Sequence, residues 1–378
     1  GGAVLFSTLR GESKQNQKKS NEYFTASLIG VAILAAIAWM AVIFFDRELL
    51  ILFGAEETLL PLAQRYLLPV KFAVPSFLLT QLLAAFLRND GNPGLATKAV
   101  LFGGIFNVFG DWFFVFALDM GVMGAGLATV MGSVFSLIIM LTHFFSKKNT
   151  LRLEKPAKLF SMLKSISVTG FSTFFLDVAM GILTMLFNRQ ILQYLGTLSV
   201  YGIIINISTF VQCCAYSIGQ ASQPIISTNF GAHKGKRIRE VLQYALATAA
   251  VFGLIWTALA EFAPNLFVSI FMAPTDGILE IAPAIIRSYG ISFLLLPLNI
   301  FSTYYFQALM KPSISFVVSV SRGAVVSGIL IYLLPSIAGA DSLWFAMPIT
   351  ELLVAIFVVI MMTRYTKQLL SDDRKQNA

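Results

Sequence analysis

Residues 91–129, GNPGLATKAVLFGGIFNVFGDWFFVFALDMGVMGAGLAT, decide the fold of this chain. The pattern predicts a membrane-spanning helix at about 95–118, a tight turn at 119–121 and the start of a second membrane helix. Asn107 and Asp111 lie four residues apart in the first span, so their side chains project from one helical face. A carboxylate near the bilayer centre costs about 2.5–3.5 kcal/mol. We therefore expect this pair to face a protein interior, a cavity or an ion.

The composition is that of a membrane protein. Hydrophobic residues make up 57% of the 378 residues and charged residues 12%, and the mean hydropathy is +0.78. A soluble domain carries about 25% charged residues. Apolar runs of about 20 residues recur along the chain, which predicts a polytopic helical membrane protein. Cys213 and Cys214 are adjacent within a span, an arrangement that disfavours a disulfide or a metal site.

Ten complete spans are predicted, and residues 1–8 resemble the tail of another span. The ten spans are 24–45, 66–87, 95–118, 121–145, 165–188, 199–227, 241–262, 284–308, 313–335 and 342–364. The sequence opens with GGAVLF, with neither a Met nor the charged start of a signal peptide. We expect it to be truncated at its N-terminus.

The net charge of +8 resides mainly in one set of alternate loops. The opposite set holds only Arg47, Arg65, Arg189 and Arg287. This asymmetry fits the positive-inside rule better than nucleic-acid binding, and it predicts a cytoplasmic C-terminus.

The two halves of the chain repeat each other. Ser7-Thr8-Leu9-Arg10-Gly11 matches Ser227-Thr228-Asn229-Phe230-Gly231 at an offset of 220 residues. The segments 88–93 and 307–312, each ending in proline, match at an offset of 219. Equivalent loops share one predicted side of the membrane, so the repeats are parallel. We expect an N-lobe at 1–145, a cytoplasmic linker at 146–164, a C-lobe at 165–364 and a cytoplasmic tail at 365–378.

Four motifs narrow the class of transporter. They are GQASQPIISTNFGA at 219–232, YGIIINI at 201–207, FQALMKP at 306–312 and GAGLAT at 124–129. With these motifs the chain resembles the multidrug and toxic-compound extrusion (MATE) family over essentially its whole length, most of all the bacterial drug-efflux branch. The resemblance implies an all-α protein with two pseudo-symmetric six-helix bundles. The spans would be helices 3 to 12, with helix 1 and most of helix 2 missing.

The resemblance also implies a function and a site. Family members export cationic amphipathic compounds from the cytoplasm by alternating access, in exchange for Na⁺ or H⁺. In one branch the coupling cation is held by an Asp on helix 1, an Asn and an Asp on helix 5 and a Thr on helix 6. Asn107, Asp111 and Thr129 match the last three, and the helix 1 Asp has no counterpart in this sequence. A second family pattern places an acid on helix 7, where Asp177 lies.

Each candidate residue has a structural alternative. Asn107 and Asp111 could form a helix-packing hydrogen bond, and Thr129 could bond to its own helix backbone. Asp177, with Phe174, Phe175 and Met180, suits a flat organic cation through charge and cation–π attraction; the alternative is a polar partner such as Arg322. For Arg322 and Glu351 themselves we expect a structural ion pair between helices.

Other classes of protein are less consistent with the sequence. A lipid-linked precursor flippase would need a cationic cavity, whereas the mid-span acids Asp111, Asp177 and Glu351 outnumber Arg322. A channel lacks a filter-like loop, and a membrane-embedded enzyme lacks a nucleophile–base or metal-spaced set. No phosphate-binding Gly-Lys-Ser/Thr loop is present. We thus predict a monomeric multi-pass transporter of the bacterial inner membrane. Its partners are an organic cation and the lipid bilayer, with no nucleic acid, and it needs no cofactor beyond the coupling Na⁺ or H⁺.

Overall fold

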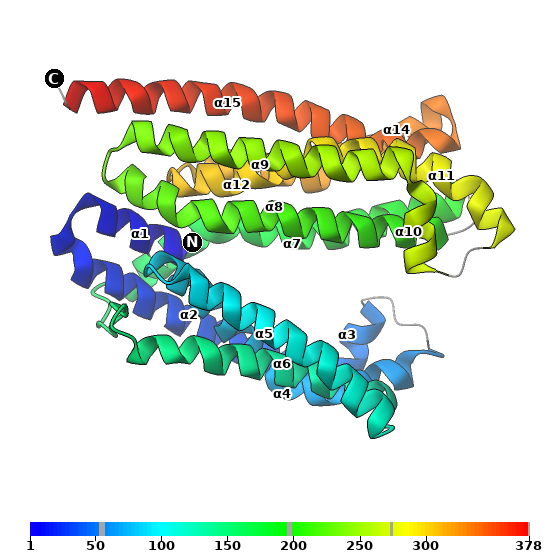
Figure 1. Cartoon of the computed structure of the whole chain (residues 1–378), viewed down its shortest axis with the longest axis horizontal. Helices are drawn as coiled ribbons and strands as arrows, with labels where there is room; N and C mark the ends of the chain where they lie inside the picture. Colours follow the sequence, from blue (N-terminus) through cyan, green and yellow to red (C-terminus); the bar gives the residue numbers. More distant parts are fainter. Residues whose placement is uncertain (53–56, 195–198, 273–274, 377–378) are drawn as a thin grey trace. The chain divides into compact units, whose positions relative to one another are not determined.

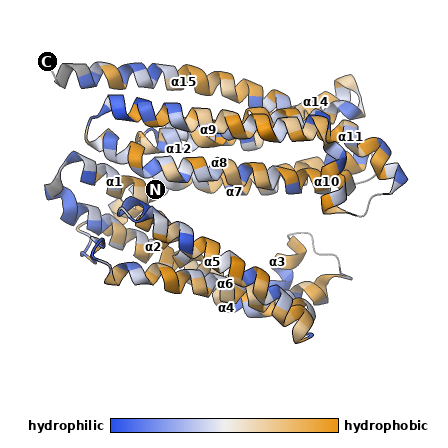
Figure 2. Ribbon diagram, viewed as in Figure 1, coloured by the Kyte–Doolittle hydropathy of each residue, from blue (hydrophilic) through white to orange (hydrophobic). Residues whose placement is uncertain are grey.

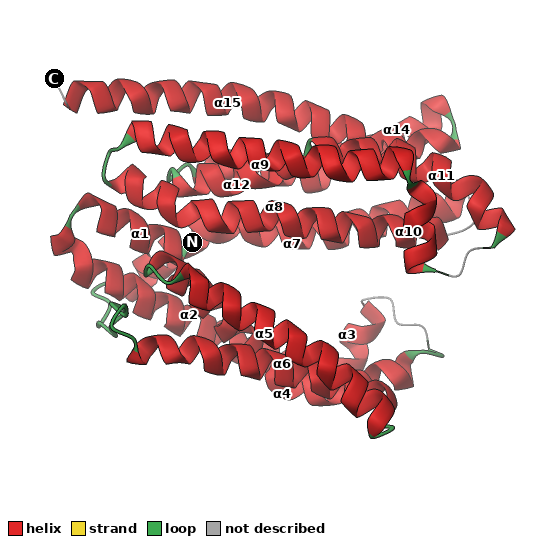
Figure 3. Ribbon diagram, viewed as in Figure 1, coloured by secondary structure: helices red, strands yellow, loops and turns green. Residues whose placement is uncertain are grey.

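A computed structural model of the chain describes residues 1–52, 57–194, 199–272 and 275–376, and these residues form helices and loops without a strand (Figure 3). Ten helical segments of the described chain are long and apolar enough to cross a membrane. They are 17–44, 60–89, 93–117, 121–145, 159–194, 200–231, 235–262, 276–308, 312–338 and 340–373. Each overlaps one of the ten predicted spans, so the all-α, multi-pass fold is confirmed.

The chain divides into two compact units. The N-terminal unit comprises Gly2–Phe6 and Gln15–Ile166, and the C-terminal unit comprises Gly1, Ser7–Lys14 and Ser167–Ala378. Residues 146–164, predicted as a separate linker, belong to the N-terminal unit. The division into lobes, linker and tail remains a prediction, and the last two residues of the tail lie outside the described chain.

The N-terminal unit is built from α2 to α6. Its elements are α2 (Gln17–Phe44), α3 (Asp46–Leu52), α4 (Leu60–Asn89), α5 (Pro93–Asp111), a π-helical segment (Trp112–Ala117), α6 (Gly121–Leu141) and a 3₁₀ turn (Thr142–Phe145) (Figure 1). Its core lies near the ends of the spans that carry the basic loops, which we call the basic end. There Phe86 packs edge-on against Phe6 of α1 (Gly2–Glu12) at a ring-centroid distance of 5.4 Å and against Phe24 at 5.0 Å.

A buried polar cluster ties the segment after α6 to the end of α4. His143 Nε2 lies 2.8 Å from Asp90 Oδ2, and neither side chain is exposed. The backbone N–H of Thr150 donates to the same carboxylate at 2.9 Å, and the Thr150 hydroxyl donates to its other oxygen. Asn92 Nδ2 lies 3.1 Å from His143 Nδ1. The start of the predicted linker is therefore packed against the N-terminal unit.

The C-terminal unit is built from α7, beginning at Ser167 within that helix, to α15. Its α-helices are α7 (Leu159–Tyr194), α8 (Ser199–Gly231), α9 (Gly235–Phe262), α10 (Pro264–Phe271), α11 (Asp276–Gly290), α12 (Leu296–Ala308), α13 (Pro312–Val320), α14 (Val326–Ala338) and α15 (Ala346–Gln376). Three spans change helix type along their length, at 3₁₀ segments Ile291–Leu294 and Ala340–Phe345 and at a π-helical segment Ser321–Val325. Pro297 follows the first of these breaks in the first turn of α12, where its missing N–H costs no intrahelical hydrogen bond.

The helix ends differ from the helix centres in polarity. Figure 2 shows hydrophilic residues at the N-terminal end of α9 and the C-terminal end of α15, with hydrophobic residues along the middle of both helices. The two ends lie together, because the Lys236 N–H donates to Asp373 Oδ2 at 3.1 Å. Apolar centres with polar ends are the pattern expected of helices that cross a bilayer.

Candidate cation and substrate sites

The structure brings two of the three predicted cation-site residues into contact. Asn107 of α5 donates from Nδ2 to Thr129 Oγ1 of α6 at 3.4 Å. Thr129 also donates to the carbonyl of Ala125 at 3.0 Å, which is the helix-backbone bond given as its alternative. Thr129 therefore makes the backbone bond and the contact with Asn107 at once.

A third residue joins this contact. The Tyr66 hydroxyl of α4 lies 3.2 Å from Thr129 Oγ1. No sequence signal marks this role, because a tyrosine near the end of a span is also typical of an interfacial aromatic residue. The result is a cluster of one amide and two hydroxyl groups contributed by α4, α5 and α6.

Asp111 is the last residue of α5, immediately before the π-helical segment. Single-turn π segments often occur at functional sites. Asp111 is half-buried, and no hydrogen bond or ion pair joins it to another residue in the described part of the chain. Its carboxylate thus lies one turn from Asn107 on α5 and is not neutralised by a basic side chain of that part.

Small residues allow α5 and α6 to approach closely enough for the Asn107–Thr129 contact. A Cβ added to Gly132 would lie 2.7 Å from the Gly103 carbonyl oxygen and 3.0 Å from Asn107 Cβ. Further along the crossing, a Cβ on Gly110 would lie 3.0 Å from Ala128 Cβ. Close crossings through small residues are typical of membrane helices.

In the C-terminal unit Asp177 and Met180 belong to one polar network with α8. The Tyr216 hydroxyl lies 3.5 Å from Asp177 Oδ1 and 3.4 Å from Gln212 Oε1. Gln212 Nε2 in turn lies 2.9 Å from Met180 Sδ. Gln212 and Tyr216 were missed in the sequence, although their spacing of four residues in an apolar span is the signal that identified Asn107 and Asp111.

Phe174 and Phe175 lie in an aromatic cluster just before Asp177. Phe171 is their shared neighbour, with ring centroids 5.9 Å from Phe174, 6.3 Å from Phe175 and 5.5 Å from Phe316 of α13. Phe174 is 60% exposed. A hollow of about 360 Å³ borders this cluster, lined by Ser167, Val168, Phe171, Pro312, Ser313 and Phe316. The aromatic faces and Asp177 thus lie along the same helix, α7.

The ion pair predicted between Arg322 and Glu351 is present in the structure. Arg322 Nε donates to Glu351 Oε1 at 2.7 Å, and the two side chains are 3% and 0% exposed. Asn299 Nδ2 donates to the other carboxylate oxygen at 2.7 Å. This charge pair holds α12, α15 and the π-helical segment after α13 together in the core, and Arg322 is not the salt-bridge partner of Asp177.

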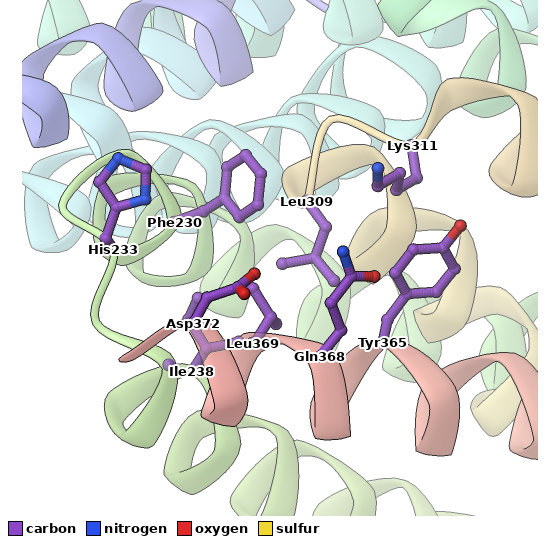
Figure 4. Close-up of a pocket in the computed structure, with 10 residues that line it drawn as sticks. Phe230, His233, Ile238, Leu309, Lys311, Tyr365, Gln368, Leu369 and Asp372 are labelled. Atoms are coloured by element: carbon purple, nitrogen blue, oxygen red, sulfur yellow. The ribbon is translucent and has the colours of Figure 1, made fainter. Parts of the chain in front are cut away.

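A smaller pocket lies at the basic end of the C-terminal unit. In Figure 4, Tyr365, Gln368, Leu369 and Asp372 project from α15, and Lys311 and Leu309 lie across from them. The pocket has a volume of about 200 Å³, below the roughly 300–1,000 Å³ of sites for drug-sized ligands. The pocket is therefore too small for a drug-sized ligand.

Among the described residues, no group of three or more His, Cys, Asp and Glu side chains is placed to hold a metal ion.

A model of the MatE family matches residues 13–113 and 173–333, which is more than half of the chain. Multidrug export protein MepA of Staphylococcus aureus (strain MSSA476) is 23% identical over 366 residues, covering 95% of this chain and 79% of that protein. The Staphylococcus saprophyticus protein of the same name is 22% identical over the same length.

Solved structures show the same fold. The MATE multidrug transporter DinF-BH, solved in complex with rhodamine 6G, matches with a TM-score of 0.85 and 26% identity over 96% of this chain and 82% of that one. A multidrug resistance MATE family transporter in an outward-facing conformation matches with a TM-score of 0.87 and 19% identity, covering 98% of this chain and 83% of the other.

Proposed function

Because this chain belongs to the MatE family and is a membrane transporter rather than an enzyme, we propose that it exports amphipathic organic cations in exchange for inward-moving Na⁺ or H⁺. The observation that carries the proposal is which of the mid-span charges are paired with an opposite charge. Arg322 is neutralised by Glu351, whereas Asp177 is exposed and is hydrogen-bonded to a neutral tyrosine. In the middle of its spans the C-terminal unit therefore offers an acid, not a base, to a ligand.

The side chains around Asp177 suit a flat cation. Phe174 and Phe175 offer aromatic faces, and cations are attracted to such faces by about 0.5–2 kcal/mol, more when water is excluded. The thioether of Met180 adapts to ligands of different shape. The DinF-BH complex with its rhodamine dye supports this choice of substrate class. A flippase for lipid pyrophosphates would need uncompensated basic groups in place of these residues.

In this proposal Asp111 and the cluster of Tyr66, Asn107 and Thr129 in the N-terminal unit form the coupling site. Na⁺ would be held by the Asp111 carboxylate with oxygens of Asn107, Thr129 and Tyr66; a proton would bind Asp111 itself. One charge moving down 100 mV supplies about 2.3 kcal/mol, which corresponds to roughly a fiftyfold concentration ratio. Export of a monovalent cation moves one charge in the opposite direction, so a one-for-one exchange is driven by the concentration gradient of Na⁺ or H⁺ alone. Entry of two ions per exported cation would add this contribution of about 2.3 kcal/mol, and neither stoichiometry requires ATP.

Binding of the same rhodamine dye to the purified 378-residue chain tests the substrate site. We expect fluorescence polarisation to show saturable binding that Asp177→Asn weakens about tenfold, because the cation loses its counter-charge. The matched control is Glu280→Gln, which removes one exposed acid from the same unit. Equal affinities for the Asp177→Asn and Glu280→Gln variants would place the dye elsewhere.

Thermal unfolding in Na⁺ and in choline buffers, each at pH 6 and pH 8, tests the coupling site. If Na⁺ is the ion, we expect it to raise the Tm, since a ligand that binds only the folded state stabilises it, and Asp111→Asn to abolish the rise. Asp119→Asn is the control: it removes an exposed acid at a turn position with φ 51°, which Asn adopts as readily as Asp. A Na⁺ effect that survives Asp111→Asn contradicts this assignment.

The orientation is part of the same proposal. We propose that the C-terminus lies in the cytoplasm of a bacterium, which the distribution of basic loops supports, and that the protein acts as a monomer in the plasma membrane. A C-terminal fluorescent-protein fusion that lights up, beside a C-terminal alkaline phosphatase fusion that stays inactive, is the expected result.

A further inference from the structure

A groove on the C-terminal unit combines an apolar channel with two cationic side chains at one end. It lies between α9, α12 and α15 and has a volume of about 370 Å³. The residues that line it are Arg239, Leu242, Gln243, Leu246, Leu298, Val359, Met362, Thr363, Thr366, Lys367 and Leu370. We call it the α9–α15 groove. It lies apart from the predicted substrate residues, which are on α7.

The order of residues along the groove separates charge from apolar surface. α9 runs away from the basic end of the unit and α15 runs towards it (Figure 1). Arg239 and Lys367 therefore lie near the basic end. Leu246 lies seven residues further along α9, about 10 Å deeper at 1.5 Å per residue. Val359, which is 52% exposed, lies at a similar depth on α15. A ligand that fits must be charged at one end and apolar along its length.

Within the described chain, the two cations have no acidic partner. No carboxylate of these residues forms a salt bridge with Arg239 or Lys367, and none of the described residues that line the groove is acidic. Gln243 also lines the groove, is exposed, and adds an amide donor. Two uncompensated cations with a nearby amide form a binding surface for a phosphate group.

A corresponding groove lies in the N-terminal unit. It runs between α2, α4 and α6 with the segment that follows α6, which are the repeat counterparts of α9, α12 and α15, and it has a volume of about 550 Å³. Leu79 in it occupies the position of Leu298 in the repeat. Its lining is apolar except for one cation, Arg152. The same combination of apolar walls and a cation thus occurs in both repeats.

We propose that the α9–α15 groove binds an anionic phospholipid of the cytoplasmic leaflet. One acyl chain lies along Leu242, Leu246 and Leu298, and the phosphate lies between Arg239 and Lys367. A zwitterionic lipid would bring its own cation to this end of the groove, so an anionic headgroup is preferred. The cytoplasmic leaflet follows from the orientation proposed above; the binding itself does not depend on drug export.

Photolabelling of the 378-residue chain in phosphatidylcholine nanodiscs tests the proposal. The probe is phosphatidylglycerol with a diazirine in one acyl chain, followed by peptide mapping. We expect label in peptides that contain residues 239–246 and 359–370, and we expect unlabelled phosphatidylglycerol to compete about tenfold better than phosphatidylcholine. Label confined to other peptides, or equal competition by the two lipids, would overturn the proposal.

Two matched double variants separate a site from general surface charge. Arg239→Gln/Lys367→Gln should lower labelling of the groove about tenfold. Arg237→Gln/Arg364→Gln removes the same charge from exposed residues of α9 and α15 that do not line the groove, and should change labelling only slightly. Thr363→Trp should block labelling with both cations intact. Equal loss in the two double variants would reduce the effect to general attraction and overturn the site.

Discussion

Glu351 has no exposed surface in the C-terminal unit, so its charge depends on Arg322 and Asn299. Removing one partner of a buried ion pair typically costs about 3–5 kcal/mol, whereas replacing both with apolar residues is often neutral. We expect Arg322→Met to lower the Tm strongly and Arg322→Met/Glu351→Leu to restore most of it. Thermal unfolding of the purified variants measures both. A single variant as stable as the parent would mean that Glu351 finds another partner.

Asp46 forms another ion pair, in the N-terminal unit, at the end of the spans away from the basic loops. Lys71 Nζ lies 2.5 Å from Asp46 Oδ2. The hydrogen bond from Lys71 holds the pKa of Asp46 below its ordinary value, against the desolvation that raises it. A lowered folded-state pKa contributes stability that is present above the ordinary pKa of about 3.9 and is lost as the pH falls through the folded-state value.

The pH dependence of this pair is therefore testable. Because the pair is partly exposed, we expect Lys71→Gln to cost at most about 1 kcal/mol at pH 7 and progressively less below about pH 4. Thermal unfolding between pH 3 and pH 7 measures the difference, and Arg47→Gln is the control because Arg47 contacts Asp46 through its backbone N–H. A Lys71→Gln deficit that stays constant to pH 3 would contradict the assignment.

Among the helices, the α5–α6 crossing fixes the geometry of the cation site. Gly132→Ala would place a Cβ 2.7 Å from the Gly103 carbonyl oxygen, so the two helices must separate. We expect a cost of about 1–3 kcal/mol and a weaker Na⁺ effect on Tm, because the Asn107–Thr129 contact is already 3.4 Å. Gly104→Ala is the control, since its Cβ meets no atom within 4 Å. A full Na⁺ effect in Gly132→Ala would separate the crossing from the site.

The helices could largely be predicted from the sequence, because a run of about 20 apolar residues is enough to identify a span. Polar residues spaced four apart within a span then identified candidate site residues. The features that could not be predicted are those that depend on contacts between helices. The π-helical segments after Asp111 and at Arg322 depend on how side chains pack, and no local composition marks them. Tyr66 meets Thr129 only through the fold of α4 against α6. The Arg322–Glu351 pair was predictable because two opposite charges in apolar spans have few other partners.

At the scale of the whole molecule, two segments that match each other in the internal repeat also contact each other. The two matching segments, 7–11 of α1 and 227–231 of α8, meet within the C-terminal unit. Ser7 Oγ lies 2.5 Å from Ser227 Oγ. A Cβ on Gly11 would lie 2.0 Å from the Thr228 carbonyl oxygen, and a Cβ on Gly231 would lie 2.0 Å from the Thr8 carbonyl oxygen. Each of the two segments thus presents its glycine to the other's threonine, so the contact between them is reciprocal.

This reciprocity predicts a particular pattern of stabilities. Gly11→Ala and Gly231→Ala should each lower the free energy of unfolding by about 1–3 kcal/mol, since a backbone oxygen must move in both cases. The double variant should cost less than the sum, because one displacement of the crossing accommodates both methyl groups. Gly202→Ala, also in α8, meets no atom within 4 Å and should be neutral or stabilising by up to about 1 kcal/mol. Denaturant or thermal unfolding of the four variants decides the matter: if Gly231→Ala matched Gly202→Ala, or if the two single costs simply added, the close reciprocal crossing would be wrong.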